Sequence, residues 1–193
     1  ARIYRVVYEG NEGLDKKALE QADALVRDGL DPNNESQLVA ALKHPNFLWR
    51  RAAQRLLIEK GSLSEETLKA LNGLVRDKAV DSVGLNVGAI HALWVLQGIG
   101  TALPTAAAVE HPSPAVRRNG IQTAQDSLAS LQAIADKNLL FDEDPQVRLA
   151  ALLRVSDSNV SEPRIAAALA NPTRIAALPG AQRSDAWLLD AWT

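Results

Sequence analysis

The chain of 193 residues contains no cysteine, and this absence excludes several kinds of site. Disulfide bonds, Cys-ligated zinc, iron–sulfur clusters, covalently attached c-type haem and thiol nucleophiles all require cysteine. Methionine is also absent, even at position 1, so we expect the chain to be an internal piece of a longer protein. No apolar run approaches the ~18 residues that a membrane-spanning helix needs, and no signal peptide is visible. The sequence therefore predicts neither a cofactor nor a membrane span.

Neither sign of charge dominates the composition. The chain has 21 Lys and Arg against 23 Asp and Glu, which gives a formal net charge of −2. This balance supplies no overall basic surface for nucleic acid and no acidic tail. Aromatic residues are scarce at 4%, but 47% of the residues are apolar. A chain of this length and composition is expected to form one domain that buries roughly 70% of the surface of the unfolded chain.

The motifs of common catalytic sites are missing as well. The sequence contains no GxSxG, Walker, GxGxxG or HExxH pattern. The acidic cluster at Asp142, Glu143 and Asp144 lacks the ordered oxygen spacing and the glycine of a calcium loop, so we interpret it as charge that favours a helix N-terminus. His44 and His111 each precede a proline at matching positions and are interpreted as turn residues. We therefore expect no enzyme activity and no metal site in this segment.

What the chain does contain is a helical unit that recurs. Residues 44–61, HPNFLWRRAAQRLLIEKG, begin with a His-Pro turn and end at a glycine. Between them, apolar residues recur at i, i+3, i+4, i+7 and i+8, which is typical of an amphipathic helix. This stripe consists of Trp49, Ala52, Ala53, Leu56 and Leu57. Similar units follow His111 and Asp144.

Further helices are predicted on both sides of this unit. Six of them cover residues 14–27, 35–43, 83–96, 104–109, 128–135 and 161–170, the last with Ser161 as its cap. Another helix is opened by the capping-box spacing of residues 62–65, and a last helix begins at Ser184. The helix at 83–96 is apolar almost all round, so we expect neighbours to cover it on several sides. Residues 1–8, ARIYRVVY, predict a β-strand. A lone strand is not stable, so residues 1–13 are interpreted as an arm or the last strand of a preceding domain, and residues 14–193 as a helical repeat domain.

Arginines mark the spacing of the repeat. Arg50, Arg117 and Arg148 each lie near the start of a helical unit, and a further unit fits between the first two if Ala53 is matched to Ile90. The resulting intervals are 37, 30 and 31 residues. An irregular period in the thirties with two helices per unit is typical of an α-solenoid. The predicted fold is therefore all-α, an α-α superhelix of stacked helix pairs.

The short pattern of Pro, one residue, Val and Arg resembles HEAT-like repeats. Residues 114–117 (PAVR) and 145–148 (PQVR) carry it best, whereas Trp49 stands in the valine position of the first unit. The resemblance implies a right-handed superhelix in which a proline-containing turn opens a helix. It also implies that the arginine, here Arg117 or Arg148, forms a polar ladder between neighbouring units.

A second resemblance concerns the order of three segments. RIYRVVYEG, HPNFLWRRAAQRLLIEKG and AIHALWVLQGIG look like the middle region of large exported fusion proteins of planctomycetes and verrucomicrobia. Those proteins resemble a sugar-dehydrogenase-type β-propeller followed by HEAT-like repeats and a small c-type haem domain. The resemblance covers most of residues 1–125 and implies a periplasmic or otherwise exported location. Neither the propeller's catalytic groups nor a CxxCH motif is present, so no redox activity is assigned to this segment.

The most basic stretch offers a candidate interaction surface. Trp49, Arg50, Arg51 and Arg55 suit an anion- or partner-binding face, with Trp49 as a flat anchor. The alternative is that Arg50 joins neighbouring repeats and that Trp49 lies in the core, since arginine recurs at the equivalent place in later units. His91, close to Trp94 on its helix, is either a ligand or proton carrier or a packed side chain hydrogen-bonded to a carbonyl group.

Three functions are compatible with these observations. The first is a non-catalytic scaffold that binds a protein partner or neighbouring domains of its own chain. The second is the helical part of a periplasmic dehydrogenase or electron-transfer protein, which a polar pocket formed by Arg50, His91 and Trp94 would favour. The third is a HEAT-like nucleic-acid-binding protein, against which the net charge of −2 argues.

Overall fold

The described part of the chain, in a computed structural model, is residue 20 and residues 24–169. Within it, every regular element is a helix, so the predicted all-α class is confirmed there. The strand or arm predicted at 1–13 and the helix predicted from Ser184 lie outside the described residues. The helices are α2 (Glu35–Ala41), α3 (Phe47–Glu59), α4 (Glu65–Arg76), α5 (Val87–Gly98), α6 (Thr105–Val109), α7 (Pro114–Thr123), α8 (Leu128–Asp136), the 3₁₀ helix η1 (Leu139–Phe141), α9 (Pro145–Ser156) and α10 (Pro163–Leu169).

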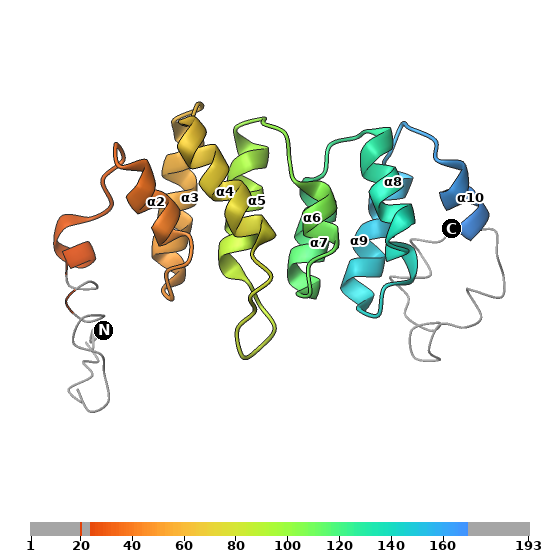
Figure 1. The fold of residues 1–193 in the computed structure, drawn as a ribbon, viewed down its shortest axis with the longest axis horizontal. Helices are drawn as coiled ribbons and strands as arrows, with labels where there is room; N and C mark the ends of the chain where they lie inside the picture. The colour runs from red at the N-terminus through yellow and green to blue at the C-terminus, as the bar shows by residue number, and fades with distance from the viewer. Residues whose placement is uncertain (1–19, 21–23, 170–193) are drawn as a thin grey trace, which may run out of the picture.

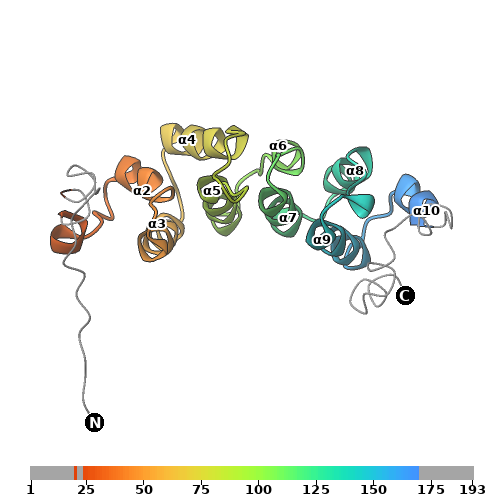
Figure 2. The ribbon, with the colours of Figure 1, turned by 90° about the horizontal axis from the view of Figure 1, so that it is seen from below.

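The helices stand in a row of two layers (Figures 1 and 2). Helices α2, α4, α6 and α8 form the outer layer, and helices α3, α5, α7 and α9 form the inner layer. Successive helices within each layer contact one another, and α2, α4 and α6 each pack against an inner helix as well. Helix α8 is connected to α9 through η1, which contacts both. Figure 2 shows that the row bends and that the inner layer lies on its concave side. None of the described helices has the length and hydropathy needed to cross a bilayer.

Among the described residues, the core consists of two apolar clusters along the row. The first is formed mainly by α2 to α5 and includes Leu57, Leu71 and Leu93, all fully buried. The second extends from the end of α6 to α10 and includes Ile121 and Val147. Each helix pair buries its apolar face against the neighbouring pairs, because a single pair has too little surface to cover that face by itself.

Helix α5 is covered on several sides, as its composition predicted, but it begins later than predicted. It packs against α3, α4 and α7. Its first residue is Val87, whereas Val83 lies in the preceding turn with 74% of its surface exposed. The Asp81 carboxylate accepts the backbone N–H of Val83 at 3.0 Å and of Leu85 at 2.8 Å, and Gly84 has φ +78°. Asp side chains that bond nearby backbone groups in this way favour a turn over a helix.

The late start of α5 changes the spacing between successive inner helices. The residues that precede the inner helices, Asn46, Asn86, Ser113 and Asp144, follow one another at intervals of 40, 27 and 31 residues. The arginine-based alignment gave 37, 30 and 31, so matching Ala53 to Ile90 is three residues out of register with the helix starts. The unit around Ile90 lacks both the Pro and the Arg of the pattern, and its register was predicted wrongly.

Two helix caps also differ from those predicted. Ser64, not Ser62, precedes α4, and its hydroxyl accepts the Thr67 backbone N–H at 3.2 Å. The Glu35 carboxylate of α2 accepts the Ser64 N–H at 3.1 Å and its hydroxyl at 2.7 Å. Hydrogen bonds from Thr67 and Ser64 lower the pKa of Glu35 to about 2. Before α10, the carboxylate of Glu162, not Ser161, accepts the Arg164 backbone N–H at 3.0 Å.

The outer helix α6 and the inner helix α7 approach each other closely at a glycine of α7. A Cβ atom added at Gly120 of α7 would meet the Ala108 Cβ of α6 at 2.6 Å. Such a distance is shorter than packed carbon atoms tolerate. The pairing of α6 with α7 therefore depends on small residues at this crossing, which compensates for the short length of α6.

Candidate interaction surface on helix α3

Arg50 joins two elements of the first unit. Its Nη1 donates to the carbonyl oxygens of His44 at 2.6 Å and Pro45 at 2.7 Å, which closes the turn before α3. Its Nε donates to Nε2 of His91 on α5 at 3.3 Å. The half-buried guanidinium therefore satisfies carbonyl groups at the start of its own helix and reaches the next inner helix. Most of its donors are used within the fold.

Arg117 repeats this geometry in a later unit. Its Nη1 donates to the carbonyls of His111 at 3.0 Å and Pro112 at 3.1 Å. Its Nε and Nη2 form a two-pronged pair with the Asp142 carboxylate at 2.9 and 2.8 Å. Arg148 likewise donates from Nη1 to the carbonyls six and five residues before it. The three aligned arginines thus hold equivalent positions, and two of them connect neighbouring inner helices or their turns.

The turn residue in front of each of these helices has an equivalent role. The Nδ1 atoms of His44 and His111 accept backbone N–H groups two residues later, from Asn46 at 3.0 Å and Ser113 at 2.9 Å. Asp142 does the same through Oδ1 toward the Asp144 N–H at 2.9 Å. This match between Asp142 and the histidines was not predicted from the sequence. The signal was available, because all three lie six residues before an aligned arginine.

His91 is buried with both ring nitrogens engaged. Nε2 accepts from Arg50, and Nδ1 lies 2.6 Å from Oε1 of Gln54 on α3. Because the amide oxygen only accepts, the ring carries its proton on Nδ1 and is neutral. Burial, with a smaller effect of the Arg50 charge, lowers the pKa of His91 to about 4. This arrangement is that of a packed structural histidine, the second of the two roles that the sequence allowed.

Protonation of His91 should destabilise the fold. The pKa is about 4 in the folded chain against 6.5 for an unperturbed histidine, so the unfolded chain binds the proton first as the pH falls. Stability should therefore fall between pH 6.5 and 4, by about 2–3 kcal/mol from this group. Urea unfolding at both ends of this range measures the change.

His91→Gln is the matched control for this prediction. Glutamine still offers a donor and an acceptor but does not titrate. Burial also lowers the pKa of His111, so some pH dependence is expected to remain in the variant. Wild type and variant should differ in their loss of stability on acidification. Parallel curves for the two proteins would show that the Arg50–His91 contact does not govern the titration.

Trp94 is directed to a different neighbour. Its Nε1 donates to Oδ1 of Asn119 on α7 at 2.8 Å, and Asn119 donates in turn to the Ala115 carbonyl at 2.8 Å. Arg50 and His91 bond to each other, whereas Trp94 links α5 to α7. Three residues proposed together from the sequence are thus divided between two contacts.

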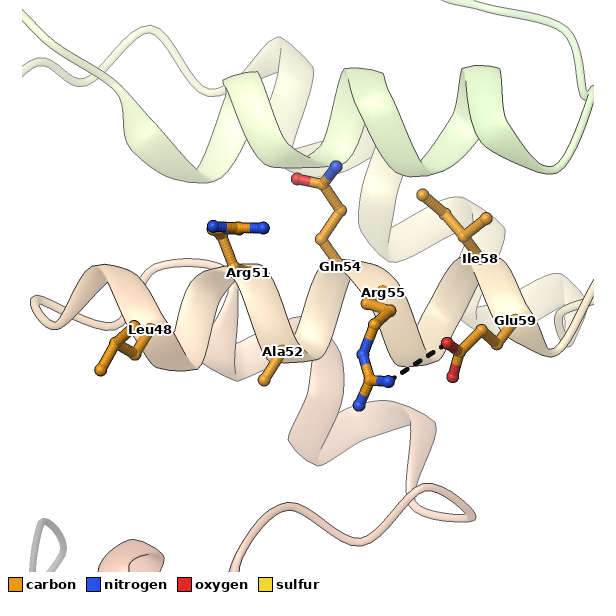
Figure 3. Close-up of a pocket in the computed structure, with 7 residues that line it drawn as sticks. All are labelled: Leu48, Arg51, Ala52, Gln54, Arg55, Ile58 and Glu59. Carbon is orange, nitrogen blue, oxygen red and sulfur yellow. Dashed lines mark hydrogen bonds and ion pairs between the residues drawn. The ribbon is translucent and has the colours of Figure 1, made fainter.

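The exposed face of α3 carries the remaining predicted residues (Figure 3). A shallow groove of about 430 Å³ runs along it, lined by Leu48, Arg51, Ala52, Gln54, Arg55, Ile58 and Glu59. Arg51 lies 5.8 Å from the centre of the Phe47 ring, and Arg55 pairs with Glu59 at 3.3 Å. Gln54 and Ile58 point toward α5, whereas Leu48 and Ala52 lie on the opposite side of the groove.

The most exposed apolar residues of this surface are not Trp49 but the two residues before it. Trp49 is half-buried, whereas Phe47 is 52% and Leu48 70% exposed. The two residues that correspond to Trp49 in later units, Val116 and Val147, are fully buried. Sequence periodicity placed Trp49 on the core stripe and overlooked the two apolar residues before it, which fall on the outer side of the first turn.

The described residues contain no group of three His, Asp or Glu side chains arranged as metal ligands. In comparisons with known proteins, no family model, no curated protein and no solved structure matched the chain. Function is therefore argued from the geometry of the surface itself.

Proposed function

We propose that this chain is a non-catalytic interaction module, a HEAT-like superhelix of helix pairs that binds a protein partner or a neighbouring domain of its own chain. Stacked helix pairs provide a long concave surface, which repeat proteins use for binding. The resemblance to exported fusion proteins adds the proposal that the module works in the periplasm or outside the cell.

One observation supports this function above the others. The side chains that suit catalysis, Arg50 and His91, bond to each other and to the fold, whereas Leu48 and Arg51 on the same side of the row are exposed. Proteins leave apolar groups exposed beside cations where partners bind. The exposed residues therefore suit the binding of a partner, whereas the bonded Arg50 and His91 stabilise the fold.

Selection of peptides on the immobilised chain tests the proposal. A random-peptide library should yield binders with Kd values of about 1–100 μM, the range of modest interfaces. Leu48→Asp should weaken selected peptides by about tenfold, because it removes an apolar contact worth roughly 1.4 kcal/mol. Val83→Asp is the matched control, since Val83 is similarly exposed but belongs to the turn before α5 and not to α3. Failure to select any peptide, or equal losses in both variants, would count against an interaction surface on α3.

A further inference from the structure

Charge is segregated between the two layers of the row. Within their bounds, inner helices α3, α5, α7 and α9 carry one carboxylate, Glu59, and seven arginines. These are Arg50, Arg51, Arg55, Arg117, Arg118, Arg148 and Arg154. The outer helices α2, α4, α6 and α8 carry four carboxylates and two cations within their bounds. A chain with a net charge of −2 thus places an excess of positive charge on its concave layer.

Only some of these arginines are committed to the fold. Arg50, Arg117 and Arg148 donate to the turns before their helices, and Arg154 lies 3.5 Å from the Asp126 carboxylate. Arg51 and Arg55 lie on the exposed face of α3, where Arg55 contacts Glu59 of its own helix. The three remaining arginines, Arg51, Arg55 and Arg118, carry the positive charge that a partner can reach.

Arg118 faces the concave side of α7. The helix is in contact with α5, α6 and α9, and the residues on those three sides are buried. Ala115, Arg118 and Gln122 form the remaining stripe and are partly or fully exposed. The Nε of Arg118 is screened from solvent and has no acceptor among the described residues. A carboxylate of a bound partner would supply the acceptor that this N–H group lacks.

Aliphatic side chains accompany the arginines along the inner layer. Leu48 on α3 is 70% exposed and Leu153 on α9 is 48% exposed, and one exposed aromatic ring, Phe47, lies at the start of α3. Nucleic acid is bound by closely spaced cations along a backbone path, with aromatic rings for stacking. Separated arginines between aliphatic side chains instead match a polypeptide whose carboxylates alternate with apolar residues, since the guanidinium binds carboxylate with two parallel hydrogen bonds.

We propose that the concave face of the inner layer binds an acidic polypeptide segment, with Arg51, Arg55 and Arg118 pairing with its carboxylates and Leu48 and Leu153 contacting its aliphatic side chains. This inference rests on the proposed interaction function and names the chemistry of the partner.

Fluorescence anisotropy with defined probes tests the inference. The first probe is a labelled peptide of glutamates interspersed with leucines. Three others replace the glutamates by lysine, replace the leucines by serine, or consist of single-stranded DNA. The full chain should bind the Glu-Leu peptide best, and added salt should weaken it. Arg51→Glu with Arg118→Glu should weaken binding at least about tenfold. Lys69→Glu with Arg76→Glu, the same charge change on exposed residues of α4, should alter it less than about twofold.

The outcomes separate this inference from the proposed function. Binding of the lysine peptide as tight as that of the glutamate peptide would overturn the acidic partner while leaving a peptide-binding module. Arginine-dependent binding of DNA in preference to the Glu-Leu peptide would assign the face to nucleic acid instead. If the double variant fails to fold, Arg51→Glu alone, at an exposed position, should weaken binding of the Glu-Leu peptide about threefold. An unchanged affinity there would also overturn the inference.

Discussion

Replacing Arg117 with alanine should lower the free energy of unfolding by about 3–5 kcal/mol, the usual cost of breaking a buried ion pair by removing one partner. The side chains of Arg117 and Asp142 are only 10% and 8% exposed, and they form two parallel hydrogen bonds. Truncation leaves the Asp142 carboxylate buried beside its own turn and frees the carbonyls of His111 and Pro112. Urea unfolding followed by circular dichroism measures the loss.

The neighbouring arginine is a control of the same residue type on the same helix. Arg118→Ala removes a guanidinium that no ion pair holds within the described residues, so we expect a loss below about 1 kcal/mol. A double-mutant cycle with Asp142→Asn isolates the contribution of the pair itself. Equal losses for Arg117→Ala and Arg118→Ala would show that the link between α7 and the turn before α9 does not stabilise the fold.

Replacing Val147 with aspartate should unfold the C-terminal part of the row. Val147 is fully buried in the second apolar cluster. An unpaired carboxylate in such a place, added to the loss of the valine, is expected to cost more than about 4 kcal/mol. Hydrogen exchange should show lost protection in α8, α9 and α10.

The first apolar cluster should respond less, because it is formed mainly by α2 to α5 and does not contain Val147. A row of helices in which each contacts only its neighbours can unfold in parts when one interface is weakened. Gln146→Asp, at the exposed neighbouring position in the first turn of α9, is expected to be neutral or slightly stabilising. Melting of Val147→Asp at the wild-type temperature would contradict the placement of α9 in the core.

Several helices could be predicted closely because their signals are local. The predictions at 104–109 and 128–135 agree with α6 and α8 within one residue at each end. Pro104 and Ser127 mark these starts, since proline and serine favour the first positions of a helix whatever lies around it. The start of α5 was misplaced because the Asp81 turn depends on backbone contacts that apolar periodicity does not record.

The candidate site was likewise predictable from the sequence only in part. Alignment of the sequence was enough to group Arg50, Arg117 and Arg148, which all bond the turn before their helix. It was not enough to separate them from Arg51, one residue beyond the first of them. A shift of one residue turns a side chain by about 100° around a helix. Which side is then covered depends on the neighbouring helices.

The sequence by itself determined that this chain forms short amphipathic helices separated by capped turns, because periodicity and capping act over a few residues. Only the tertiary structure decided that His91 is neutral between Arg50 and Gln54, that Trp94 bonds to Asn119, and that α3, α5, α7 and α9 share one concave layer. Those contacts join residues 25 to 41 positions apart. Their formation depends on how successive helix pairs stack, which local pattern does not encode.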